Sequence, residues 1–183
     1  QEYTLEVNLQ EAEADPDEFQ YNCPVSAAGP CATSGGGWQL LSIPLADFFD
    51  DNAFVAGGDG ALGTALDTVV VAVIGSGSDV TFRTDYWGFS SGPLTPGAPD
   101  VIDDFENGLP FGSASPNGEP IGFYTFQGDG SVAIATTSTP PAPALPEVGE
   151  PNNVLQMDVD VSSFAGYIHA FENEAFDTWV TQD

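Results

Sequence analysis

Apolar and polar side chains alternate along most of the chain, and helical periodicity is rare. In residues 3–9 four apolar side chains alternate with polar ones, the pattern of a strand with one buried face. Residues 38–43 form a second alternating run, which we expect to be a strand that Pro44 terminates. Only residues 45–50 and 172–176 suit a helical turn. Further strands are predicted over residues 68–74, 80–89, 101–105, 122–126, 131–136, 154–161 and 166–172.

Segments rich in proline and glycine separate these strands. Residues 92–99 (GPLTPGAP) contain three prolines and two glycines, which suits a stiff, exposed connection. Residues 139–151 contain five prolines and are expected to be a loop. Many short strands between such turns predict an all-β chain folded as an antiparallel β-sandwich or jelly roll. We divide it into a first segment, 1–91, the connection 92–99 and a second segment, 100–183.

The chain is strongly acidic, which restricts its partners. Its 28 Asp and Glu residues face one basic residue, Arg83, so the formal net charge is −27. Because this charge repels polyanions, nucleic acid and anionic membranes are excluded as partners. No apolar run approaches the ~20 residues of a membrane span. Salt or divalent cations would screen the self-repulsion, so we expect a saline or calcium-containing setting, with simple solubility as the alternative.

The two cysteines indicate an oxidising compartment. Cys23 and Cys31 bracket a short stretch with two prolines and a glycine, and their spacing predicts a disulfide that closes a surface loop in an extracellular or cell-surface protein. Two free thiols are the alternative. A zinc site is disfavoured because the only histidine, His169, lies in a different segment. Without a signal peptide or Met at Gln1, a processed or internal segment of a longer protein is expected.

Four motifs together resemble a known family. Residues 38–49 (WQLLSIPLADFF) open with Trp and reach an Ile-Pro pair before an acidic-aromatic turn, and residues 79–89 (DVTFRTDYWGF) place an acidic residue before apolar positions. Residues 103–108 (DDFENG) and 154–172 supply the other two motifs. In combination they resemble galactose-binding-like jelly rolls, in particular carbohydrate-binding module family 11 and its relatives. The resemblance covers most of the chain.

The order of these motifs departs from that family. Elements resembling the end of the module occupy residues 1–91, and elements resembling its beginning occupy residues 100–183. The family also implies an aromatic-rich strand between one at Trp179 and one like residues 3–9, and the chain reaches Asp183 without it. The fold is therefore expected to be permuted, or completed by a neighbouring chain. An open strand position would invite strand addition, and head-to-tail completion would propagate into a fibre.

The resemblance also implies a structural calcium site. In the resembled modules the first and last strands lie side by side, and carboxylates from both hold the ion, which takes six to eight oxygen ligands. The alternative is solvated acidic turns. The GDG triplets at residues 58–60 and 128–130 are expected to be plain turns. The implied calcium ligands are Asp85, Asp103, Asp104 and Glu106.

Aromatic side chains offer platforms for sugar rings, although burial in the sandwich is the simpler reading for each. The near absence of basic side chains weakens a carbohydrate site. The sequence contains one histidine and neither a nucleophile elbow nor a phosphate loop, so it is expected to be non-catalytic. His169 is expected to be packed or edge-exposed. The aromatic platforms are Tyr86, Trp87, Tyr124 and Trp179.

These observations favour a non-catalytic, extracellular structural module. We expect copies of the chain, or adjacent repeats, to associate end to end into a surface filament or sheath by strand or domain complementation, aided by cations. The alternative is a carbohydrate-binding module of a secreted multidomain enzyme or adhesin, with polysaccharide as its partner.

Overall fold

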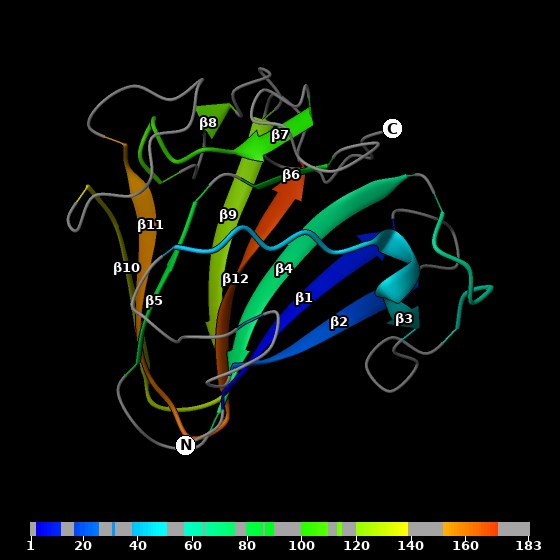
Figure 1. Ribbon diagram of the computed structural model, residues 1–183, viewed down its shortest axis with the longest axis horizontal. Helices are drawn as coiled ribbons and strands as arrows, with labels where there is room; N and C mark the ends of the chain where they lie inside the picture. The colour runs from blue at the N-terminus through cyan, green and yellow to red at the C-terminus, as the bar shows by residue number, and fades with distance from the viewer. Residues whose placement is uncertain are drawn as a thin grey trace.

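A computed structural model shows an all-β chain built from antiparallel sheets (Figure 1). It describes residues 3–11, 17–25, 31, 38–50, 57–63, 65–75, 80–85, 87–89, 100–109, 113–114, 120–138 and 152–171. The strands in the first segment are β1 (Tyr3–Glu11), β2 (Glu18–Val25), β3 (Phe49–Asp50), β4 (Leu66–Ile74), β5 (Val80–Thr84) and β6 (Trp87–Phe89). Those in the second are β7 (Asp100–Asp103), β8 (Ser113–Ala114), β9 (Pro120–Gln127), β10 (Ser131–Thr137), β11 (Val154–Asp160) and β12 (Phe164–Phe171).

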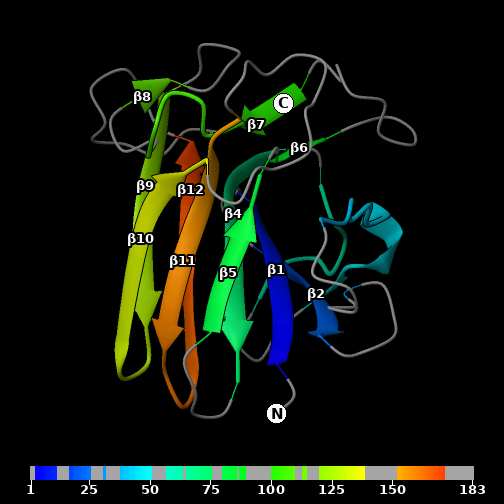
Figure 2. The same cartoon turned by 60° about the vertical axis from the view of Figure 1, so that its left-hand side comes forward.

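The described strands form a sandwich. A seven-stranded sheet has the order β3-β2-β1-β4-β12-β9-β8, and a three-stranded sheet has the order β10-β11-β5. Figure 2 shows the three-stranded sheet lying over the larger one. A two-stranded sheet, β6-β7, lies at one end of the sandwich in both views (Figures 1 and 2). Among the described residues no helix is long and apolar enough to cross a membrane.

Period-two alternation places the core between the layers. The apolar side chains of β1 lie opposite valines of β4, because the register pairs Leu5 with Val73, Val7 with Val71 and Leu9 with Val69. All six are buried. From the other layer, β11 contributes its own alternate positions, and burying such side chains is the main favourable term in folding. These positions are Leu155, Met157 and Val159.

The two predicted segments pair within one chain. Every sheet combines strands from both, since β4 pairs with β12, β5 with β11 and β6 with β7. Residues 79–89, which resemble the end of the module, thus pair through β6 with β7, where the segment that resembles its beginning starts. The predicted open strand position stays a prediction, and β1 itself has β2 on one side and β4 on the other. Trp179 and the connection 92–99 lie outside the described residues.

Three strand predictions need correction. Residues 38–43 are extended but join no ladder: Leu41 and Ile43 pack against the core while Leu40 is exposed. The alternation there specifies a half-buried segment, and it does not require a hydrogen-bonded neighbour. The predicted strand 80–89 breaks after Thr84 into β5 and β6, which join different sheets. The strand β2 was not predicted, because the Cys and Pro of its last residues favoured a loop.

Two local predictions are confirmed. Cys23 and Cys31 form a disulfide with a Cα–Cα distance of 5.9 Å, and Cys23 is buried in the core. A 3-10 helical turn occupies Leu45–Asp47. The second predicted helical turn, residues 172–176, lies outside the described residues.

The triplet at residues 128–130 is a structural turn. The Asp129 carboxylate accepts hydrogen bonds from the backbone N–H groups of Ser162 and Ser163, and these seryl contacts, led by the Ser162 hydroxyl, lower the pKa of Asp129. Gly130 has φ 63°, and a Cβ there would lie 1.8 Å from the Asp160 carbonyl oxygen. Only glycine fits this position without displacing the backbone. The turn thus ties the β9–β10 connection to the β11–β12 connection.

Candidate functional site

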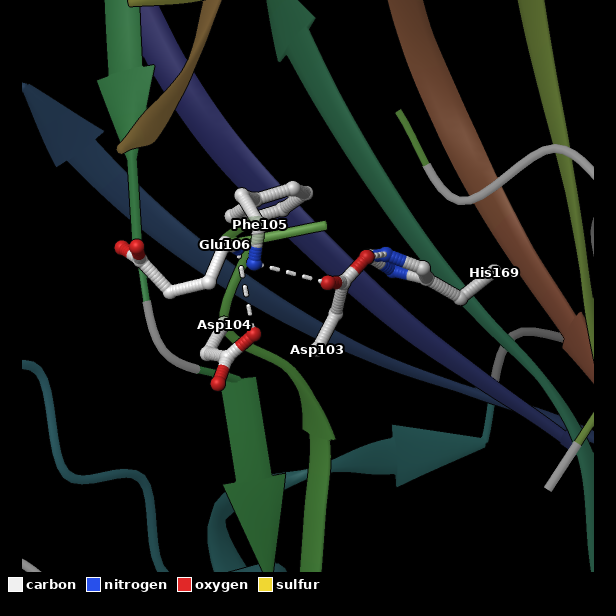
Figure 3. Close-up of polar contacts among 5 residues, drawn as sticks. All are labelled: Asp103, Asp104, Phe105, Glu106 and His169. Carbon is white, nitrogen blue, oxygen red and sulfur yellow. Dashed lines mark hydrogen bonds and ion pairs between the residues drawn. The ribbon is translucent and has the colours of Figure 1, made fainter. Parts of the chain in front are cut away.

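The acidic turn after β7 is organised by Asp103. Its Oδ1 accepts the Phe105 N–H at 2.8 Å, and its Oδ2 lies 3.0 Å from His169 Nε2 (Figure 3). The first bond is a local turn in which an Asp side chain replaces a backbone acceptor. It accompanies a left-handed conformation at Phe105, with φ 56°, and that side chain is completely buried. Both oxygens of Asp103 therefore have partners within the fold.

His169 lies in the core beneath this turn. Its ring is fully buried and packs against Phe105, Phe123 and Tyr167, with centroid distances of 5.9, 5.4 and 5.4 Å. His169 Nδ1 has no hydrogen-bond partner in the described part of the chain. Burial raises the pKa of the neighbouring Tyr167 hydroxyl. Of the two placements expected for His169, packed or edge-exposed, the structure shows the packed one.

The other predicted calcium ligands face a pair of asparagines. Glu106 Oε1 accepts the Asn153 N–H at 2.7 Å, and Glu106 Oε2 lies 3.3 Å from Asn153 Nδ2. Asp85, which follows β5, accepts the Asn152 amide at 3.0 Å. Asn152 and Asn153 directly precede β11, so the ends of β5 and β7 meet at its start. We name Asp85, Asp104, Glu106, Asn152 and Asn153 the acidic junction.

Asp104 lies beside this pairing and has no long-range hydrogen-bond partner within the part of the chain that the structure describes. Its Oδ1 accepts the Glu106 N–H at 3.2 Å, and partial burial raises the pKa of its carboxyl group. Figure 3 shows Asp103 directed toward His169 and Glu106 directed away from it. The four predicted ligands thus come from neighbouring elements, but their carboxylates do not converge on one point.

The metal prediction stays a prediction. Within the described residues, no three Asp, Glu, His or Cys side chains are grouped so that they could hold an ion. The two asparagines were not anticipated from the sequence. The signal was present as an Asn-Asn pair between Pro151 and a clear strand, since amide side chains commonly satisfy backbone and carboxylate groups where a strand begins.

The predicted sugar platforms are dispersed. Trp87 is half-buried on β6 and packs against the core, whereas Tyr124 on β9 is exposed. Tyr124 lies on the outward face of the large sheet, the same face as Phe126 and Phe164, whose rings are 6.2 Å apart. Tyr86 and Trp179 lie outside the described residues. Of the two predicted platforms that the structure describes, Tyr124 is therefore exposed and Trp87 is half-buried.

Comparisons of the chain with protein-family models, curated proteins and solved structures found no match. The resemblance to galactose-binding-like modules remains a prediction, and function must be argued from the geometry.

Proposed function

We propose that the chain is a non-catalytic structural module at the cell surface or outside the cell, with a galactose-binding-like jelly-roll fold, whose copies associate end to end into a filament or sheath. The supporting observation is the edge strand β10, Ser131–Thr137, with the sequence SVAIATT. In its sheet β10 pairs only with β11 among the described strands. An edge strand presents unpaired backbone groups, and natural proteins usually protect it with charges, proline or a bulge.

The β10 edge has none of these protections. It contains no charged residue and no proline, and its register with β11 runs without a shift from Ser131 to Thr137. In a chain with a net charge of −27, contact between copies costs least where no carboxylate must be buried. This edge satisfies that condition over seven residues.

The opposite edge of the same sheet supports propagation of the contact. That edge is β5, which carries Arg83, the only basic residue of the chain. If β10 of one copy pairs with β5 of the next, the contact joins two different surfaces and is repeated in every copy, which gives a filament. Cations, including calcium at the acidic junction, would screen the repulsion between copies.

A charge placed on this edge tests the proposal. Ala133 is exposed on β10, and Ala133→Lys is expected to raise the protein concentration needed for polymerisation by about tenfold, because a lysine on an edge strand opposes the addition of a further strand. The control is Asn22→Lys, the same charge change at an exposed position on β2. Light scattering and electron microscopy in salt and calcium measure the polymers. A wild-type protein that stays monomeric under these conditions, or equal polymerisation of both variants, contradicts the proposal.

A carbohydrate-binding module is the second candidate, supported by the outward aromatic residues of the large sheet. Tyr124 is 37% exposed and Phe164 is 41% exposed, and with Phe126 they place three aromatic rings on one outward face, which is the kind of apolar patch that marks a binding surface. If monomeric wild-type protein is retained on an insoluble polysaccharide, Tyr124→Ala is expected to weaken retention about tenfold. Retention of the variant equal to that of wild type would remove this surface as the site.

A further inference from the structure

A second cluster of acidic residues lies at the other side of the molecule, where Asp17 contacts the loop formed by residues 57–63. Asp17 immediately precedes β2 and is only 1% exposed. Its Oδ2 accepts the N–H groups of Asp59 at 2.9 Å and of Gly60 at 3.0 Å. Its second oxygen, Oδ1, is buried and has no hydrogen-bond partner among the described residues.

The loop can approach this carboxylate because glycines stand on both sides of Asp59. Gly58 and Gly60 have φ values of 69° and 74°, which L-residues with side chains rarely adopt. A Cβ on Gly58 would lie 1.5 Å from Asp17 Oδ1 and would overlap the carboxylate group, so only glycine allows this close approach. The backbone of the loop therefore lies directly against Asp17 Oδ1.

The neighbouring buried acids differ from Asp17. Glu18 is 2% exposed, and its two oxygens accept the side-chain amides of Asn8, at 3.3 Å, and Gln10. Glu11 accepts the N–H of Gly63. Asp59, although part of the loop, is exposed and accepts the N–H of Ala61. Asp17 Oδ1 thus differs from the oxygens of Glu18 in having no hydrogen-bond partner among the described residues.

No basic side chain lies beside Asp17 among the described residues. Arg83 is the only Lys or Arg in the sequence, and its Nε donates to Gln156 on the opposite sheet at 2.9 Å. His169 is paired with Asp103 in the core. A second carboxylate adjoins the loop instead, because Asp50 Oδ2 lies 3.5 Å from where a Cβ on Gly60 would be. Burying a carboxylate without an opposite charge or full hydrogen bonding is costly.

We propose that Asp17 and Asp50, together with main-chain oxygens of residues 57–63 and water, bind a hard divalent cation, with Ca²⁺ as the best match. Calcium accepts carboxylates, backbone carbonyls and water in flexible geometry, so two carboxylates can anchor a site. This need not conflict with the absence of a group of three His, Cys, Asp or Glu side chains within the described residues. The ion would join the β1–β2 connection to the loop before β4. This proposal is independent of self-association.

Calcium titration of chelator-treated protein tests the site at low concentration, where polymers do not form. Isothermal titration calorimetry and thermal melting are recorded with CaCl₂, with MgCl₂ and with NaCl at matched ionic strength. Wild type is expected to bind Ca²⁺ and to melt at a higher temperature with it than with NaCl, because the ion binds only the folded chain. Asp17→Asn keeps an acceptor for the two N–H groups and is expected to bind Ca²⁺ at least about tenfold more weakly.

Asp160→Asn is the matched control, since Asp160 is exposed on β11, belongs to neither acidic cluster and leaves Asp17 intact. It is expected to retain the wild-type calcium affinity, and Glu106→Gln tests the acidic junction separately. If Asp17→Asn does not fold, Asp50→Asn is used in its place with the same expected loss. The proposal is overturned if wild type binds no Ca²⁺, if NaCl reproduces the whole stabilisation, or if only Glu106→Gln loses binding. The last outcome would assign the ion to the acidic junction.

Discussion

Replacing Asp103 with alanine is expected to lower the free energy of unfolding by about 3 kcal/mol. The substitution removes the acceptor that lies 3.0 Å from the buried His169 Nε2 and the acceptor of the Phe105 N–H. His169 would then have no partner for either ring nitrogen within the described residues, and Phe105 would lose the bond that accompanies its left-handed backbone. Urea denaturation followed by tryptophan fluorescence measures the change.

Two variants separate this effect from a general effect of the acidic turn. Asp103→Asn keeps an oxygen that can accept from Phe105 and a polar group beside His169, so it is expected to cost clearly less than alanine. Asp104→Ala removes the adjacent carboxylate, which is only half-buried, and is expected to cost less than about 1 kcal/mol. Equal destabilisation by Asp103→Ala and Asp104→Ala would show that the buried pair with His169 contributes nothing specific.

Gly166→Ala is expected to destabilise the protein by a similar amount, about 3 kcal/mol, because of overpacking between two central strands. Gly166 lies in β12 opposite Ala72 of β4. A Cβ at Gly166 would be 2.3 Å from the Val71 carbonyl oxygen and 2.9 Å from the Ala72 Cα. Both atoms belong to the backbone, so the added methyl group can fit only if β12 and β4 move apart. Thermal melting monitored by circular dichroism gives the change in stability.

The control for this variant is Gly108→Ala. Gly108 has φ 91°, so alanine is strained there, but a Cβ would meet no atom within 4 Å. The expected cost is about 1 kcal/mol, from backbone conformation alone. If Gly166→Ala were no more destabilising than Gly108→Ala, the close approach of β12 to β4 would be wrong.

Much of the fold could be predicted from alternation, but the candidate site could be predicted only in outline. The period-two pattern of β1 specified its core-facing apolar side chains correctly, and the continuous β-branched run of β4 matches a central strand that is buried on both faces. The strand β2 was not predicted because the Cys-Pro pair near its end is typical of a loop. Residues 38–43 alternate like a strand but pair with no other strand among the described residues, and alternation alone does not show whether a pairing strand is present.

The acidic residues illustrate the same limit at the level of chemistry. The sequence places Asp103, Asp104 and Glu106 within four positions, but which carboxylate points inward depends on β12, which brings His169 beneath the turn. The role of Asn153 depends likewise on β11 starting beside Glu106. No sequence pattern indicated that Asp17 is buried and bonded, because its partner Asp59 lies 42 positions away in the sequence. These contacts depend on which strands and loops lie together in the fold, and this cannot be read from local composition.

The pairing of both halves of the chain in every sheet has a consequence for folding. Since β4 lies between β1 and β12, its ladders are complete only when residues 164–171 have been synthesised and have returned to it. Such a high contact order slows folding, because loop-closure entropy is lost before the distant strands contribute. For a chain this acidic, closure also brings like charges together. We therefore expect the folding rate to rise with ionic strength, because dissolved ions screen the repulsion that opposes closure.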